Sequence, residues 1–264
     1  MPQPAAHAVK AHTVAIVQAR WGSSRLPGKV LEDIGGRPLL ARVVERVQAS
    51  TTCDAVVVAT TTDVQDDLVV DLARQCGADT FRGSVDDVLD RFHRAAAEAG
   101  ADVVVRITAD DPFKDPEVID LVARQLLDDS ALDYASNTLA PTFPEGLDVE
   151  CFTFRALEQA WEQAELPSER EHVTPFIWTH PDRFALRNVA SEHDFSHLRW
   201  TVDYPDDLDF ARAVYERLAG RDMFNWHDVL ELLEREPQLS AINAGHERLA
   251  GYRQSLAADP KEEP

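Results

Sequence analysis

A loop rich in cations and small residues follows the first apolar run of the sequence. This loop, QARWGSSRLPGKVL from Gln18 onward, contains three cations: Arg20, Arg25 and Lys29. Four small residues lie among them: Gly22, Ser23, Ser24 and Gly28. Small residues let backbone amides approach an anion closely, so we expect the loop to bind the phosphates of a nucleoside triphosphate. It is not a Walker A loop, because valine follows Gly28-Lys29. The alternative is a surface loop with ordinary solvated cations.

Carboxylates follow two later apolar runs. RITADDP places Asp110 and Asp111 directly after a predicted strand, and RWTVDYPDDLDF places Asp203 after another. A buried carboxylate is costly unless a cation accompanies it. Magnesium is typically held by one or two carboxylates together with triphosphate oxygens. Asp110 and Asp203 therefore predict a magnesium site.

Helix capping is the competing role for the acids of these segments. Asp111 or Asp115 can cap the helix after RITADDP, and we leave this open for Asp111. Asp206 or Asp207 is predicted to act as a helix cap or first-turn acid.

Ionisable side chains in the second half form two clusters that could bind the hydroxyl groups and anions of a substrate. They are Glu145, Asp148 and Glu150 in PEGLDVE, and Arg170, Glu171 and His172 in SEREHVTPF. Acids can bind hydroxyl groups, and an arginine can bind a carboxylate or phosphate through two hydrogen bonds, which the resemblance to the family below assigns to the acceptor. The alternative makes Glu171 a first-turn helix acid and His172 a packed neutral histidine.

The elements that position these residues alternate between strand and helix periodicity. We predict strands at 13–17, 55–60, around 80–81 and at 102–110. Helices are predicted at about 37–50, 67–76 with Gly77 as the stop, 84–100 with Ser84 as the cap, and 115–129 with Pro116 in the first turn. This alternation predicts an α/β fold with a mainly parallel, doubly wound sheet. Ligands of such sheets bind beyond the carboxyl ends of the strands, where the loop and RITADDP lie.

The regular alternation of predicted strands and helices changes after about residue 133. Short strands are predicted within 147–154 and 184–190, helices within 156–165 and 169–180, and a further strand at 198–202. We expect one domain over 13–250, with a nucleotide-binding half at 13–130 and an acceptor-covering or dimerisation insert at 131–200. Loose tails are expected at 1–12 and 251–264.

Composition excludes several classes of partner. The formal net charge of −21 disfavours binding to nucleic acid or to anionic membranes. No apolar run approaches the ~20 residues that span a membrane, and the N-terminus lacks the apolar core of a signal peptide. The cysteines at 53, 76 and 151 are scattered, which suggests neither a disulfide framework nor a zinc site and fits a reducing cytoplasm.

These segments, in this order, resemble the cytidylyltransferase family that activates acidic sugars. The family includes the CMP-Kdo and CMP-sialate synthetases, and the resemblance is greatest to the branch named for spore coat polysaccharide biosynthesis protein F. ARWGSSRLPGKVL is similar to the family signature A-R-x-x-S-x-R-L-P-G-K. Later blocks are FRGSVDDVLDRF, RITADDP, FPEGLDVECFTFRALEQAW, LPSEREHVTPFI and RWTVDYPDDLDF. The resemblance covers about Val14 to Leu218.

The resemblance implies a nucleotide-diphospho-sugar transferase-like fold and a magnesium-dependent reaction. CTP and an acidic sugar would give a CMP-sugar and pyrophosphate. Nucleotide-binding residues would be Ala19, Arg20, Gly22, Ser23, Ser24, Arg25, Lys29, Arg82 and Asp110, with Asp110 and Asp203 as metal ligands. Arg82 would flank the base and ribose, or else pair at the surface with Asp86 or Asp87. Ala109 and Asp111 depart from the family, which commonly has glycine and a neutral residue there.

Other classes remain as alternatives. A glycosyltransferase using a nucleotide-diphospho-sugar has a similar fold with a D-x-D motif, whereas this chain has ADD at 109–111. A non-catalytic relative would be expected to have lost one of four residues that are all present: Arg20, Lys29, Asp110 and Asp203. Nucleotidyl transfer to a non-sugar phosphorylated acceptor and a homodimer are also open.

Overall fold

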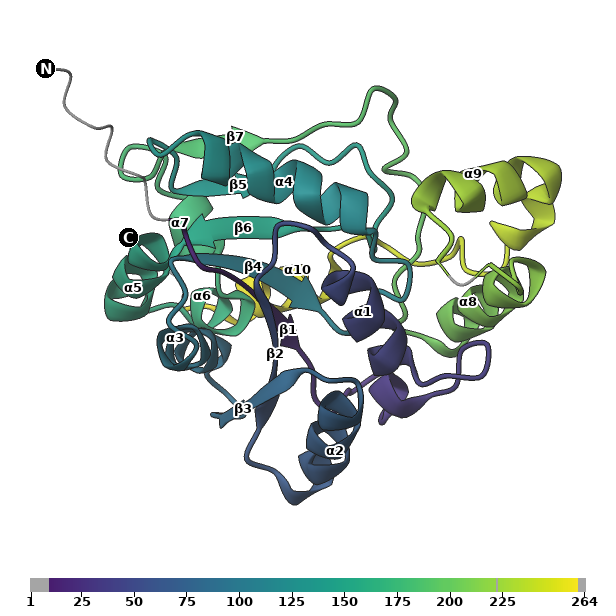
Figure 1. Ribbon diagram of the computed structural model, residues 1–264, viewed down its shortest axis with the longest axis horizontal. Helices are drawn as coiled ribbons and strands as arrows, with labels where there is room; N and C mark the ends of the chain where they lie inside the picture. The colour runs from purple at the N-terminus through teal and green to yellow at the C-terminus, as the bar shows by residue number, and fades with distance from the viewer. Residues whose placement is uncertain (1–9, 222, 261–264) are drawn as a thin grey trace, which may run out of the picture.

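A single sheet forms the centre of the computed structural model, which describes residues 10–221 and 223–260. Among these residues seven strands run in the order β3-β2-β1-β4-β6-β5-β7 (Figure 1). Their bounds are β1 Thr13–Gln18, β2 Ala55–Thr61, β3 Asp79–Gly83, β4 Val103–Thr108, β5 Tyr134–Ser136, β6 Glu150–Thr153 and β7 Leu186–Asn188. Strands β3, β2, β1 and β4 pair in parallel, β6 is antiparallel to both β4 and β5, and β7 is parallel to β5. The predicted mainly parallel α/β fold is confirmed.

Helices cover both faces of this sheet. Their bounds are α1 Leu39–Gln48, α2 Asp67–Gln75, α3 Val88–Glu98, α4 Pro116–Asp128, α5 Phe154–Gln163, α6 Pro167–His172, α7 Pro175–Trp178, α8 Pro205–Arg217, α9 Trp226–Arg235 and α10 Ala250–Ala258. One apolar core packs α1, α2, α4, α8 and α9 against the sheet, and a second packs α3, α5 and α7. Along β1, Ala15 and Val17 belong to the first core, whereas Val14 and Ile16 belong to the second. This alternation follows from the two-residue period of a strand and explains why the strand is apolar on both sides.

The first-half elements agree closely with the sequence prediction, with one difference in capping. Helix α2 ends before Gly77, whose φ of 76° suits glycine, and Pro116 opens α4 as predicted. Helix α3 begins later than predicted. Its cap is Asp87, whose carboxylate accepts a hydrogen bond from the Asp90 amide at 2.9 Å, whereas Ser84 accepts from the Asp87 amide.

The second half departs further from the prediction. Segment 198–202 is extended but is not a strand, and it forms only an isolated bridge between Arg199 and Glu145. The reason is that its amides donate to two different loops: Trp200 to the Glu145 carbonyl at 2.7 Å, and Val202 to the Asp110 carbonyl at 2.8 Å. Strand β5, three residues long, was not predicted.

The predicted tails are partly ordered. Residues 1–9 lie outside the described residues, but His12 donates its amide to the Asp102 carboxylate at 2.8 Å. The predicted tail at 251–264 is wrong for residues 251–258, which lie in α10. None of the residues of α10 is buried. Polar contacts attach it to α6, where the Asp259 carboxylate accepts hydrogen bonds from the Ser168 amide at 3.0 Å and its hydroxyl at 2.6 Å. Figure 1 shows this yellow helix returning to the middle of the molecule.

No helix within the described ranges combines the length and apolar character needed to cross a membrane.

Candidate active site

The loop after β1 is anchored to the end of β2 by Asp66. This carboxylate, only 2% exposed, accepts hydrogen bonds from the Trp21 amide at 2.6 Å and from the amide and hydroxyl of Thr61. The chain then turns back at Gly28, whose φ is 74° and whose amide donates to the Trp21 carbonyl at 2.9 Å. The turn leads directly into a 3-10 helix that begins at Lys29. Asp66 had not been singled out from the sequence.

Lys29 joins the two carboxylates that the sequence predicts as metal ligands. Its ammonium nitrogen donates to Asp110 Oδ2, to Asp203 Oδ1 and to the Val202 carbonyl, each at 2.8 Å. The residue is 7% exposed. Burial by itself lowers the pKa of Lys29, but the charges of Asp110 and Asp203 raise it above its ordinary value. The ammonium is therefore charged at neutral pH, and the two distant carboxylates meet at one cation.

Asp203 is held ionised by the cations around it. Burial opposes ionisation, yet the charge of Lys29 and hydrogen bonds from Lys29 and Arg25 lower the pKa of Asp203 to about 2. Arg25 Nη2 lies 2.7 Å from Asp203 Oδ1, and the guanidinium carbon of Arg25 lies 5.3 Å from the centre of the Tyr204 ring. Two of the predicted phosphate-binding cations, Arg25 and Lys29, thus neutralise the predicted metal ligands in this structure.

The donor set around Lys29 fits a magnesium ion. Asp110 and Asp203 present oxygen atoms that converge within 2.8 Å of a single cationic nitrogen. Magnesium prefers hard oxygen ligands and commonly uses one or two carboxylates beside substrate phosphates. A cation at this position would compete directly with the Lys29 ammonium for the same carboxylates.

Asp111 does not belong to this pair and does not cap α4. It is buried, and its Oδ2 accepts hydrogen bonds from Lys114 Nζ and from the Thr108 hydroxyl, both at 2.8 Å. Burial raises the pKa of Asp111 to about 6, although the charge of Lys114 lowers it. The cap of α4 is Asp115, which accepts from the amide of Glu117 at 2.9 Å. The extra acid therefore forms a buried ion pair beneath the site.

More positive charge lies near Arg20 than the sequence indicated. Arg20 is exposed, and the buried Arg91 of α3 lies close enough for its pKa to be affected. Burial first, and then the charge of Arg20, lowers the pKa of Arg91 to about 10. Two neighbouring guanidinium groups favour an anion between or beside them.

Arg82 has other partners than expected. Its Nε donates to the Thr61 carbonyl at 2.9 Å, its Nη2 donates to the Asp63 carbonyl at 2.7 Å, and it forms an ion pair with Asp67. It therefore ties β3 to the loop after β2 and pairs with neither Asp86 nor Asp87.

Arg199 organises the third segment and was missed by sequence reasoning. It donates to both carboxylate oxygens of Asp207 at 2.9 Å and to Glu145 Oε2 at 2.8 Å. Asp207 also accepts from the amides of Asp203 and Tyr204, which agrees with its predicted role at the start of α8. This network fixes the backbone that carries Asp203.

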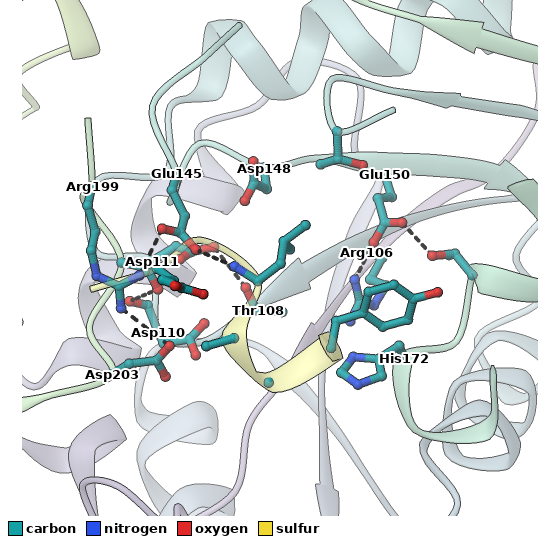
Figure 2. A pocket seen from close by; sticks show the side chains of 18 of the residues that line it. Arg106, Thr108, Asp110, Asp111, Glu145, Asp148, Glu150, His172, Arg199 and Asp203 are labelled. Atoms are coloured by element: carbon teal, nitrogen blue, oxygen red, sulfur yellow. Dashed lines mark hydrogen bonds and ion pairs between the residues drawn. The ribbon is translucent and has the colours of Figure 1, made fainter. Parts of the chain in front are cut away.

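A cavity of about 380 Å³ extends from these residues toward the second half of the chain. Its lining includes Arg25, Asp110, Arg199 and Asp203, and also Arg106, Glu150, His172, Thr174 and Trp178. Figure 2 shows Asp110, Asp203, Glu145 and Arg199 on one side and Arg106, Glu150 and His172 on the other. Residues of the C-terminal segment, including Leu249 and Tyr252, complete the lining.

The structure brings four of the six predicted acceptor-binding residues to this cavity: Glu145, Asp148, Glu150 and His172. Arg170 and Glu171 are directed elsewhere. Arg170 pairs with Asp87 and donates to the Trp161 carbonyl, while Glu171 accepts from the Ser255 hydroxyl at 2.7 Å. These two residues therefore hold helices together.

Known proteins and a protein family resemble this chain over most of its length. The family model described as cytidylyltransferase matches residues 14–245. The spore coat polysaccharide biosynthesis protein SpsF of Bacillus subtilis is 32% identical over 234 residues, which cover 84% of this chain and 94% of that protein. The 3-deoxy-manno-octulosonate cytidylyltransferase of Anaeromyxobacter dehalogenans is 30% identical over 239 residues, covering 77% of this chain and 97% of that protein. The solved structure of a cytidylyltransferase from Leptospira borgpetersenii matches with a TM-score of 0.82 and 29% identity, covering 91% of this chain and 99% of that one.

Proposed function

Because the chain belongs to the cytidylyltransferase family, we propose that it transfers CMP from CTP to a hydroxyl group of an acidic sugar in a magnesium-dependent reaction. The observation that carries the proposal is the convergence of Lys29, Asp110 and Asp203 at the carboxyl ends of the central strands. Ligands of open α/β sheets bind at this edge. The acidic sugar is inferred from the relative named for 3-deoxy-manno-octulosonate.

The residues of the first loop would bind the triphosphate. Arg20 and Arg25 lie in the loop and Lys29 follows its turn at Gly28, so we expect all three to contact phosphate oxygens once a metal ion replaces Lys29 between the carboxylates. Asp110 and Asp203 would hold the magnesium ion, which when bound supplies positive charge next to the α-phosphate. The arginines and Lys29 would neutralise charge on the departing pyrophosphate, so catalysis rests on positioning and electrostatics.

The reaction itself needs no protein nucleophile. The acceptor oxygen forms a bond to the α-phosphorus, the bond from that phosphorus to the pyrophosphate oxygen breaks, and the hydroxyl proton is released. The acceptor would occupy the cavity beyond Asp110, where Glu145 and Asp148 can accept hydrogen bonds from its hydroxyl groups.

Calorimetric titration with CTP, UTP, GTP and ATP, with and without magnesium, tests this proposal without knowledge of the acceptor. We expect magnesium-strengthened binding that favours CTP and that weakens at least about tenfold in Asp110→Asn. Asp102→Asn is the matched control, because the Asp102 carboxylate binds the His12 amide away from the cavity. Preference for a nucleotide-diphospho-sugar over every triphosphate would instead support a glycosyltransferase.

A further inference from the structure

Arg106 presents a guanidinium edge that the protein itself does not use. It lies on β4, lines the cavity and pairs across the strands with Glu150 of β6. Its Nη1 forms an ion pair with Glu150 Oε2. Within the described part of the chain, its Nε is buried without a hydrogen-bond partner, and Nη2 has none either. A buried donor without a partner typically costs about 1–3 kcal/mol.

This guanidinium is held in place by the residues behind it. Glu150 is 7% exposed, and its other oxygen, Oε1, accepts hydrogen bonds from the Tyr134 hydroxyl at 2.7 Å and from the Thr174 hydroxyl. The arginine side chain is only 15% exposed, so it has little freedom to move into solvent. A fixed, partly unpaired guanidinium is the arrangement that favours binding of a carboxylate or phosphate.

The surroundings of Arg106 differ from those of the opposite end of the cavity. Neutral residues lie beside Glu150 and His172. The Thr174 hydroxyl donates to Glu150, and the centre of the Tyr252 ring lies 5.0 Å from that of His172 and 5.8 Å from that of Trp178. His172 is also present, and burial together with the charge of Arg106 lowers its pKa, which keeps it neutral. The carboxylates of Asp110, Asp203 and Glu145 lie on the other side in Figure 2. Glu150, the acid of the lining that contacts Arg106, is already paired with the guanidinium and with two hydroxyl groups.

We propose that Arg106 binds an anionic group of the acceptor, a carboxylate or a phosphate, that is remote from the hydroxyl that attacks CTP. This inference rests on the proposed function. Arg106 lies on β4 and Asp110 in the turn just beyond its end, and Figure 2 shows Arg106 on the opposite side of the cavity from Asp110 and Asp203. When the reacting hydroxyl lies near Asp110, the part of the acceptor beside Arg106 is therefore at the other side of the cavity. The acceptor therefore carries an anion at its far end.

Inorganic phosphate, the smallest probe with the required charge, tests this site. The triphosphate loop is first saturated with α,β-methylene-CTP and magnesium, and phosphate is then titrated by calorimetry. We expect one saturable site with a millimolar Kd that weakens at least about tenfold in Arg106→Gln. Arg155→Gln is the matched control, since the Arg155 side chain is 69% exposed and pairs with Asp133 outside the cavity lining. Acetate titrated in the same way separates carboxylate from phosphate recognition.

Glu150→Gln provides a second test, in which phosphate binding is expected to become tighter and not weaker. It removes the negative charge next to the guanidinium while keeping an oxygen for the Tyr134 and Thr174 hydroxyls, so phosphate binding should tighten about fivefold or more. A purely structural role for Arg106 predicts no such gain. The proposal is overturned if wild type shows no saturable binding of either anion, or if binding is unchanged in both variants.

The same experiment distinguishes this inference from the proposed function. Absence of α,β-methylene-CTP binding, with phosphate binding that still depends on Arg106, would sink the cytidylyltransferase proposal and leave an anion site. Normal binding of the CTP analogue, with phosphate binding that is indifferent to Arg106, would sink only the acceptor inference.

Discussion

Replacing Lys29 with methionine should distinguish the roles of the Lys29 ammonium and of the proposed magnesium ion, both of which would use Asp110 and Asp203. Methionine keeps much of the length of the side chain but removes the ammonium that contacts both carboxylates at 2.8 Å. The structure predicts that binding of magnesium alone becomes tighter in Lys29→Met, while binding of CTP with magnesium becomes weaker.

The magnitude follows from Coulomb repulsion. An ammonium about 4 Å from a divalent ion is repelled by about 2 kcal/mol even at the dielectric constant of water. Its removal should therefore tighten binding of magnesium alone by about 30-fold. Loss of the contact to the triphosphate should reduce the rate of nucleotidyl transfer by about 10²–10³-fold.

The folded state should be destabilised at the same time. Breaking a fully buried ion pair costs about 3–5 kcal/mol. Here the Asp110 and Asp203 side chains are 25% and 19% exposed, and Arg25 still pairs with Asp203. We therefore expect a loss of about 2 kcal/mol in the free energy of unfolding.

Calorimetric titration with magnesium chloride, in the absence of nucleotide, measures the first effect. Lys10→Met is the control, because the Lys10 side chain is 71% exposed and pairs with Asp54 away from the site. Unchanged or weaker magnesium binding in Lys29→Met would refute the idea that the ammonium and the metal compete for the same two carboxylates. Undiminished CTP binding would refute the triphosphate role of Lys29.

Three further substitutions test individual contacts. Asp203→Asn should cost about 2 kcal/mol of unfolding free energy at pH 7, because the pKa of Asp203 falls from 3.8 to about 2 on folding. Since the folded pKa is lowered, this difference should be full above about pH 4 and vanish as the pH falls toward 2, as measured by urea unfolding at each pH. Gly146→Ala should destabilise by about 2–4 kcal/mol in the same assay, because φ is +105° and a Cβ would lie 2.7 Å from the Trp200 carbonyl carbon. Asp66→Asn should weaken CTP binding about tenfold by calorimetry, since it places an amide group against the donors of Trp21 and Thr61; an unaltered affinity would show that Asp66 does not shape the loop.

The sequence predicted most of the first half because its elements are specified locally. The apolar runs at 13–17 and 55–60 have no polar face, and that pattern predicts parallel strands covered on both sides. The same topology predicted that Asp110 lies at the edge where ligands bind, and the structure places Asp203 beside it. The segment before Asp203 is not a strand, however, and the hydrogen bond from the Val202 amide to the Asp110 carbonyl holds it beside Asp110.

The parts that the sequence did not predict depend on polar contacts between distant segments. Helix α10 has no buried residue and is attached through Asp259 and Ser168. Its sequence therefore lacks the apolar periodicity by which a packed helix can be predicted. Segment 198–202 has the composition of a strand, but its amides bind two separate loops. Arg199 resembled an ordinary surface arginine until the structure placed three carboxylates around it.

If the proposed function is correct, the position of Lys29 links nucleotide binding to metal binding. Asp110 and Asp203 lie close together in a chain whose formal net charge is −21, and Lys29 and Arg25 supply the positive charge that makes this arrangement stable. These two cations can turn to a triphosphate only if another cation takes their place between the carboxylates, since two unpaired carboxylates at this distance repel each other strongly. Conversely, a metal can replace Lys29 at low cost only when phosphate oxygens receive the displaced ammonium. We therefore infer that CTP and magnesium bind cooperatively. Lys29→Met should lose this cooperativity, because it lacks the ammonium that leaves the carboxylates for the phosphate when magnesium binds.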